Sequence, residues 1–92
     1  MKKVEIIPIA KRKVARRNIP ENWIIETVNS PMQVMAGYGG RQVAHRKYII
    51  DDKEYILRVI FEKREDIYLV VTAYLTSQIK RYWKGGKDDN RI

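Results

Sequence analysis

The alternation of apolar and polar residues divides the chain into a helical N-terminal part and a strand-rich remainder. After a short strand or extended segment at residues 4–7, apolar residues recur at helical spacing from Pro8 to Arg17 and again over residues 20–29. A proline opens each of the two segments, where its missing N–H would have no helical partner anyway. We therefore expect two short helices that form a helical hairpin.

The rest of the chain predicts a meander of strands separated by polar turns. Strands are expected over residues 33–36, 41–50, 54–62 and 67–74. The third of these strands alternates clearly, so that Arg58 faces away from the side defined by its apolar neighbours, which are Tyr55, Leu57, Val59 and Phe61. The fourth strand is apolar on both faces, which is typical of a central strand.

These elements predict an α+β fold in one domain over residues 1–84. The two N-terminal helices pack on one face of a twisted, mainly antiparallel sheet of three or four strands, and the opposite face stays partly open. One or two helical turns are expected at residues 77–83. Residues 85–92 are expected to form a flexible polar tail.

Composition narrows the class of protein further. The 92 residues are 45% hydrophobic and 33% charged, which favours a globular domain over a disordered chain. Without cysteine the chain has no disulfide or thiolate chemistry, and a single histidine leaves no His/Cys metal set, so we expect no metal and no cofactor. No apolar run is long enough for a membrane span, and the expected location is cytoplasmic.

The positive charge points to a partner. The net charge is +8, and residues 1–17 alone carry seven cations and one anion. Such an imbalance makes nucleic acid the first partner to consider. A charged surface on a thermally stable protein, or a basic face for an acidic protein partner, would produce the same composition.

The open face gathers groups that can hold a phosphate. We expect the more polar side of residues 67–74 to share that face with Arg58, which would place Tyr68, Val70, Thr72 and Tyr74 beside it. Lys80, Arg81 and Tyr82 follow at the end of this strand. RNA cleavage without a metal needs a proton acceptor for the 2′-hydroxyl, cations for the phosphorane-like transition state and a proton for the leaving 5′-oxygen. Arginine, lysine and tyrosine can serve these roles, although each can equally be an ordinary residue at the edge of the core.

His45 is the side chain whose ordinary pKa lies near neutrality. Arg41, Arg46 and Lys47 surround it in sequence and would lower its pKa, which keeps the imidazole neutral as a general base requires. The face on which it lies is ambiguous, and a surface role is the alternative. The same three cations, with Arg12 and Arg16 of the first helix, are the candidate contacts to RNA phosphates.

The glycine-rich segment at residues 37–41 is a further candidate. It lacks the spacing of a phosphate-binding loop and the strand–loop–helix setting that such a loop needs, so a flexible hairpin tip is the interpretation that we favour. Asp51 and Asp52 are adjacent and are expected in a turn rather than at a metal.

Several segments together resemble a protein family. They are residues 19–24 (IPENWI), 29–31 (NSP), 40–41 (GR), 55–59 (YILRV) and 70–83 (VVTAYLTSQIKRYW). In these segments the chain resembles short uncharacterised proteins that are often encoded beside small antitoxin-like genes and are related to the RelE/ParE and BrnT toxin superfamily. The resemblance covers about residues 5–83 and depends most on the strand that ends in Thr-x-Tyr-x-Thr-Ser.

The resemblance implies a RelE-like fold, an RNase-type toxin activity without metal, and a cognate small antitoxin that covers the active face. The residues that match recurring positions of the family are Arg58, Thr72, Tyr74, Thr76, Lys80 and Arg81. One departure is that members often carry a histidine in the first helix, where this chain has Ile9. Either the activity is weakened or lost here, or His45 takes the place of that histidine.

Three hypotheses follow. The first is a toxin endoribonuclease that acts on free or ribosome-bound RNA, with Arg58, Tyr74, Lys80, Arg81 and His45 as catalytic candidates and Thr72, Thr76 and Tyr82 as added RNA contacts. The second is a module that binds nucleic acid without cleaving it, which includes a degenerate toxin. The third is a domain whose basic face binds only an acidic protein. A homodimer is compatible with each of them.

Overall fold

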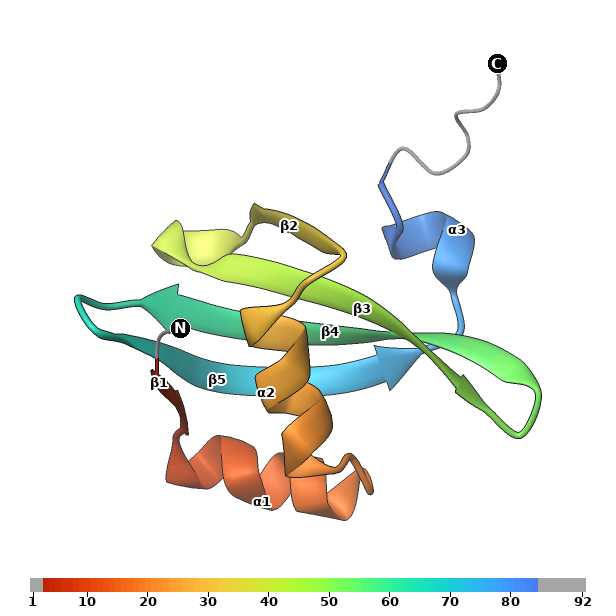
Figure 1. Ribbon diagram of the computed structural model, residues 1–92, viewed down its shortest axis with the longest axis horizontal. Coiled ribbons are helices and arrows are strands. Elements are labelled where there is room, and N and C mark those ends of the chain that lie inside the picture. The colour runs from red at the N-terminus through yellow and green to blue at the C-terminus, as the bar shows by residue number, and fades with distance from the viewer. Residues whose placement is uncertain (1–2, 85–92) are drawn as a thin grey trace.

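The computed structural model describes residues 3–84 and shows an α+β fold (Figure 1). One five-stranded sheet has the strand order β1-β5-β4-β3-β2. The elements are β1 (Lys3–Ile6), α1 (Pro8–Arg16), α2 (Glu21–Asn29), β2 (Gln33–Ala36), the 3-10 helix η1 (Tyr38–Gly40), β3 (Gln42–Ile50), β4 (Lys53–Lys63), β5 (Ile67–Thr76) and α3 (Ile79–Tyr82). The polar tail that we expected at residues 85–92 lies outside the residues that the structure describes.

The two N-terminal helices begin where the prolines predict. Pro8 occupies the first turn of α1, and Pro20 directly precedes α2 in an extended conformation. Between the helices, Asn18 adopts a left-handed conformation with φ of 58°. This turn lets the backbone N–H of Ile19 donate to the carbonyl of Val14 at 2.9 Å, so that the buried Ile19 side chain closes the hairpin.

Both helices cover the same face of the sheet. Buried Val14 of α1 and Ile24 and Val28 of α2 belong to one hydrophobic core with residues of β3, β4 and β5, namely Ala44, Leu57, Val59, Phe61, Val70 and Ala73. The predicted alternation of β4 is thereby confirmed, because its apolar set faces this core. Arg58 then lies on the other side of the sheet, which we call the open face.

The sheet has more strands than the three or four that we expected, because both short end segments join it. β1 pairs with β5 in parallel, in register from Lys3 opposite Ile67 to Ile6 opposite Val70. All other pairings are antiparallel. β5 thus lies between β1 and β4, as expected of a strand that is apolar on both faces. A segment as short as β1 carries too little alternation to predict its partner.

A β-bulge in β5 corrects one prediction about the open face. Thr72 pairs with Ile60, but the next residue of β4, Phe61, pairs with Val70, which leaves Val71 as an extra residue in β5. The extra residue reverses the alternation, so Val70 is fully buried in the core and Tyr68 packs its ring edge against Phe61 at 5.1 Å. Tyr68 and Val70 therefore do not share the open face with Arg58. Thr72 and Tyr74 do.

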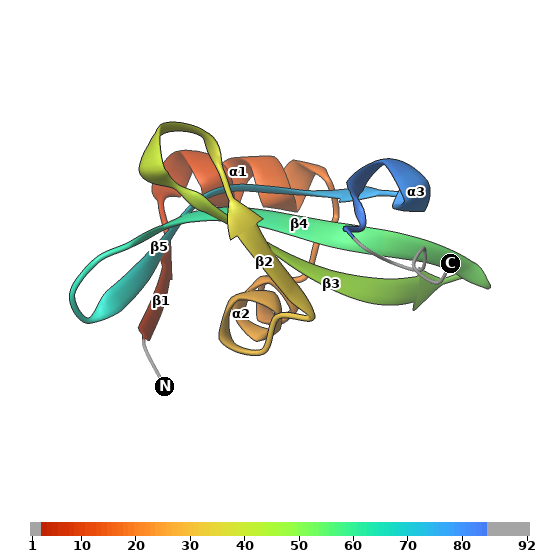
Figure 2. The same ribbon diagram turned by 90° about the horizontal axis from the view of Figure 1, so that it is seen from above.

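The C-terminal turn folds back over the open face. Figure 2 shows α3 and α2 on opposite sides of β4. The side-chain oxygen of Thr76 accepts a hydrogen bond from the backbone N–H of Gln78 at 3.1 Å, which turns the chain at the end of β5. As a result Tyr82 and Trp83 are brought back above strands that precede them in sequence.

Candidate functional site

Four polar side chains form a single row across the open face. Cα register places Gln33 of β2 opposite His45 of β3, His45 opposite Arg58 of β4, and Arg58 opposite Tyr74 of β5. Directly paired residues of neighbouring strands project on the same side of a sheet. The row therefore joins two residues that we expected together, Arg58 and Tyr74, with His45, whose facing the alternation left ambiguous.

Arg58 is the centre of this row. Its Nε donates to Nε2 of His45 at 2.9 Å, and its Nη1 donates to the hydroxyl of Tyr74. The guanidinium carbon lies 4.1 Å from the ring centroid of Tyr82 and 5.5 Å from that of Tyr74. Within residues 3–84 no carboxylate forms an ion pair with it. Neutral hydrogen-bond acceptors and aromatic rings therefore hold the guanidinium of Arg58, and its positive charge stays available to an anion.

His45 is a buried and neutral member of the row. Its side chain has an exposed fraction of 0%, and burial followed by the charge of Arg58 lowers its pKa from 6.5 to about 4. A lowered pKa of His45 was expected and is confirmed. Its causes differ from those expected, because burial and Arg58 lower the pKa rather than the cations adjacent in sequence. Its Nδ1 lies 3.3 Å from Oε1 of Gln33, which can only accept, so the proton of the imidazole sits on Nδ1.

The segment after α3 covers the His45 end of the row. Trp83 stacks over the imidazole with ring centroids 6.1 Å apart and planes inclined by 22°, and Lys47 Nζ lies 4.3 Å from the centroid of the Trp83 ring. Gln33 donates from Nε2 to the carbonyl of Lys84 at 2.5 Å and accepts from the Lys84 N–H at 3.2 Å. This pair of bonds fixes the orientation of the Gln33 amide. Trp83 thus packs the C-terminal segment onto the sheet.

A hollow of about 500 Å³ lies at the other side of the row, beneath the η1 loop. Its lining includes Ala36, Tyr38, Arg41, Val43, Arg58 and Tyr74. Arg41 is held at the rim, because its Nε donates to Oε2 of Glu62 at 3.0 Å. Hydrogen bonds from Arg64 and Arg41 lower the pKa of Glu62, so this carboxylate stays ionised at neutral pH. The hollow therefore combines two arginines, two phenols and an apolar floor.

The remaining candidates on the C-terminal segment lie apart from the row. Lys80 and Arg81 are exposed on α3, and Arg81 donates to Oε1 of Gln78 at 3.3 Å. Neither of the two contacts Arg58 or Tyr74 among the interactions of residues 3–84. Thr76 is engaged in the turn before α3. Of the six positions to which the resemblance gave a role, the structure brings Arg58, Thr72 and Tyr74 onto one face and leaves Lys80 and Arg81 at its margin.

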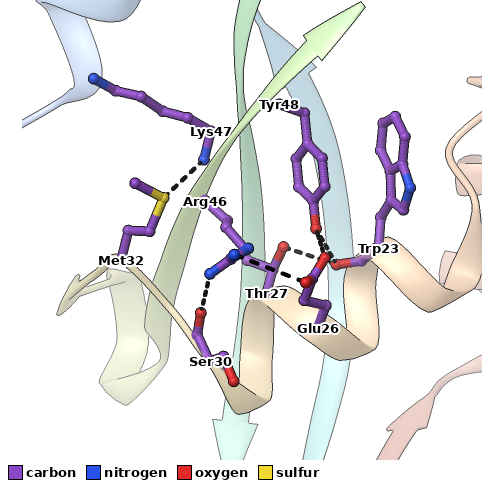
Figure 3. Close-up of polar contacts among 8 residues, drawn as sticks. All are labelled: Trp23, Glu26, Thr27, Ser30, Met32, Arg46, Lys47 and Tyr48. Carbon is purple, nitrogen blue, oxygen red and sulfur yellow. Dashed lines mark hydrogen bonds and ion pairs between the residues drawn. The ribbon is translucent and has the colours of Figure 1, made fainter.

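Three of the expected RNA contacts lie on the helical side of the sheet instead. Figure 3 shows Arg46 directed toward α2, where its Nη1 donates to the carbonyl of Ser30 at 2.7 Å and its Nη2 lies 3.8 Å from Oε2 of Glu26. The strand alternation that places His45 and Lys47 on the open face forces Arg46 to the other one. Arg12 and Arg16 are exposed on α1, which packs against the core side of β5. These three residues do not share the open face with Arg58, and their expected contact with RNA stays a prediction.

The same view shows further contacts between α2 and β3 (Figure 3). Tyr48 donates from its hydroxyl to Oε1 of Glu26 at 2.5 Å and stacks on Trp23 with centroids 4.3 Å apart. Burial and the hydrogen bond to Glu26 raise the pKa of the Tyr48 phenol. These contacts hold α2 against β3.

Sequence reasoning missed Gln33 and Tyr38. Gln33 lies in a four-residue edge strand, and no pattern in so short a segment shows which residue it faces. Tyr38 belongs to the glycine-rich segment that we interpreted as a hairpin tip, and only the fold brings this segment to the same hollow as Arg58. The sole available signal was an aromatic residue next to glycines and an arginine.

Comparison with protein-family models, curated proteins and solved structures gave no significant match. Among residues 3–84 no group of three or more His, Asp or Glu side chains is arranged to hold a metal ion. The same part of the chain contains no helix with the length and hydropathy to cross a lipid bilayer.

Proposed function

We propose that this protein is the toxin component of a toxin–antitoxin module and cleaves RNA without a metal ion. The proposal includes a RelE-like fold. It is supported by the two helices that lie between the first strand and the antiparallel meander, and by the packing of both helices on one face of the sheet. The proposed partners are RNA, free or on the ribosome, and a cognate small antitoxin that covers the open face.

The observation that carries the proposal is the pair Arg58 and Tyr74 at the edge of the hollow. Arg58 donates to the phenol oxygen, so the hydroxyl hydrogen of Tyr74 remains free to be donated elsewhere. A phosphate in the hollow would meet the guanidinium, which lacks a carboxylate partner among residues 3–84. Arg58 would stabilise the charge that develops on the phosphorane, and Tyr74 would give its proton to the leaving 5′-oxygen.

His45 has a supporting role in this scheme. The lone pair of its Nε2 is occupied by Arg58, and its ring is fully buried, so it cannot accept a proton from the 2′-hydroxyl. We therefore assign His45 as a positioning residue that acts through Arg58. Water or a phosphate oxygen of the substrate would take the proton of the 2′-hydroxyl.

A second candidate function is RNA binding without cleavage. Ile9, which stands where related proteins often carry a histidine, has an exposed fraction of 50% on α1. Since α1 lies on the helical side, neither Ile9 nor another residue of that helix supplies the row with a base. A degenerate toxin that retains the hollow but lacks proton transfer would have these features.

The deciding experiment incubates purified protein, treated with EDTA, with end-labelled single-stranded RNA and with translating ribosomes. We expect fragments that end in a cyclic phosphate, and no cleavage of RNA methylated at the 2′-hydroxyl. Arg58→Ala should abolish cleavage, whereas the matched control Arg12→Ala removes an exposed cation of the helical side and should cleave like wild type. Intact RNA with both wild type and Arg58→Ala would refute the nuclease and leave the binding module.

A further inference from the structure

We propose that the hollow beneath η1 is a subsite for one nucleotide of single-stranded RNA, with its base stacked on Tyr38 and its phosphate between Arg41 and Arg58. The inference depends on the proposed function only for its ligand, RNA. It assigns the binding of a nucleotide to a loop outside the row of Gln33, His45, Arg58 and Tyr74. The hollow, at about 500 Å³, falls in the range of roughly 300–1,000 Å³ that is typical of small-ligand sites.

The loop that carries Tyr38 has a defined conformation. The N–H of Gly37 donates to the carbonyl of Arg41 at 2.7 Å, and the N–H of Arg41 donates back to the carbonyl of Tyr38 at 3.3 Å. A Cβ atom on Gly37 would lie 3.0 Å from the Arg41 carbonyl oxygen and 3.2 Å from Cγ2 of Val43. Gly39 and Gly40 have φ of 64° and 81°. The glycines thus allow a tight turn that folds down onto the hollow.

This turn holds the Tyr38 ring out in solvent. Its exposed fraction is 95%, and neither a ring contact nor a hydrogen bond of its side chain occurs within residues 3–84. The ring therefore contributes nothing to the core, although it lines the hollow together with Arg58. An aromatic face beside a cationic surface is the arrangement on which unpaired bases stack in proteins that bind single-stranded nucleic acid.

The floor and the charges of the hollow fit the rest of a nucleotide. Val43 and Ile60 supply apolar contact for the ribose and the base edge, and Arg41 and Arg58 supply the charge for phosphate. Glu62 holds Arg41 through Nε only, which leaves its Nη groups to a ligand. Arg64 also binds Glu62, at 2.7 Å, so the three side chains together retain a net positive charge.

The test uses a short single-stranded RNA in which every 2′-hydroxyl is methylated, so that binding is measured without cleavage. We expect Tyr38→Ala to weaken binding about five-fold or more in fluorescence anisotropy at low salt, the smallest effect typical of losing one stacked base. Tyr38→Phe retains the ring and should bind like wild type. The matched control Ile49→Ala removes another exposed apolar side chain of the open face and should also bind like wild type.

Equal affinities of wild type and Tyr38→Ala would overturn the subsite, and so would equal losses in Tyr38→Ala and Ile49→Ala. Amide signals of residues 37–43 that do not shift on addition of the methylated RNA would overturn it as well. These outcomes are separate from the cleavage assay. If binding depends on Tyr38 but no RNA is cleaved, the subsite is supported and the nuclease is refuted. If RNA is cleaved but Tyr38→Ala binds like wild type, only the subsite is refuted.

Discussion

Arg58 donates a hydrogen bond from Nε to Nε2 of His45 across the β3–β4 pair, at 2.9 Å. A cation that donates to an imidazole requires the acceptor nitrogen to be unprotonated. The bond therefore fixes the protonation state of His45 as well as the position of the guanidinium. Gln33 completes the constraint from the other side of the ring.

We predict that His45 is the Nδ1–H tautomer throughout the neutral range. The reason is that Nδ1 faces the side-chain amide oxygen Oε1 of Gln33, while Nε2 accepts a hydrogen bond from Arg58. Nitrogen chemical shifts of the single imidazole should report a protonated Nδ1 and a bare Nε2 at pH 7. An imidazole that shows the Nε2–H tautomer, or a mixture of both, would contradict the geometry.

We predict that the protein loses stability as the pH falls from 6.5 toward 4. His45 has a pKa of about 4 in the folded state against 6.5 ordinarily, so the unfolded chain binds the extra proton first. The contribution of neutral His45 to the free energy of unfolding is complete above pH 6.5 and amounts to about 3 kcal/mol at most. Urea unfolding at several pH values measures it. His45→Gln removes this titration and should show a shallower acid slope; equal slopes would contradict the prediction.

We predict that Tyr74→Phe strongly lowers RNA cleavage but only slightly lowers the free energy of unfolding. The ring stays in place against Tyr82, whose centroid lies 6.5 Å away, and only the hydroxyl that accepts from Arg58 is lost. The free energy of unfolding should fall by about 1 kcal/mol. RNA cleavage should fall by roughly two to four orders of magnitude. The control Tyr55→Phe changes a phenol at the far end of β4 and should cleave like wild type. Undiminished cleavage by Tyr74→Phe would exclude the phenol as proton donor.

We predict that two glycines of the η1 loop tolerate substitution differently. Gly37→Ala forces a Cβ against the backbone of Arg41 and should lower the free energy of unfolding by about 1–3 kcal/mol. Gly39 has open space around its Cα, so Gly39→Asn should cost less, because asparagine adopts positive φ readily. Thermal unfolding of both variants checks the order, and a more stable Gly37→Ala than Gly39→Asn would contradict it.

We predict that charge reversal distinguishes the two faces of the sheet. Arg41→Glu places a negative charge at the hollow and should weaken binding of single-stranded RNA and flatten its salt dependence by about 0.7 in the log–log slope. Arg16→Glu changes the net charge by the same amount on α1 and should have the smaller effect. Anisotropy titrations at several salt concentrations compare them. Equal effects would show that RNA binding follows net charge rather than the open face.

Much of the fold was predictable because its signals are local. Pro8 and Pro20 mark the helices through their own backbone chemistry, and the alternation within β4 places Arg58 opposite the core without reference to other strands. Alternation within β5 likewise placed Tyr74 on the face of Arg58, as we expected, although their direct pairing is set by the strand register. These features depend on neighbouring residues only, so the order of residues is enough to reveal them.

The rest of the candidate site depended on pairing between distant strands. The bulge at Val71 moved Val70 and Tyr68 to the core, and a bulge exists only relative to a partner strand. The strand registers place His45 between Gln33 and Arg58, and no local pattern in the sequence encodes these registers.

The sequence by itself thus determined the α+β class, the helical hairpin, the central strands and the concentration of cations. The tertiary structure alone decided which cations share a face, that His45 is buried and neutral, and that the glycine-rich loop lines the same hollow as Arg58. The physical reason is that local sterics and hydrophobic periodicity act along the chain, whereas strand register and desolvation arise from contacts between segments far apart in it.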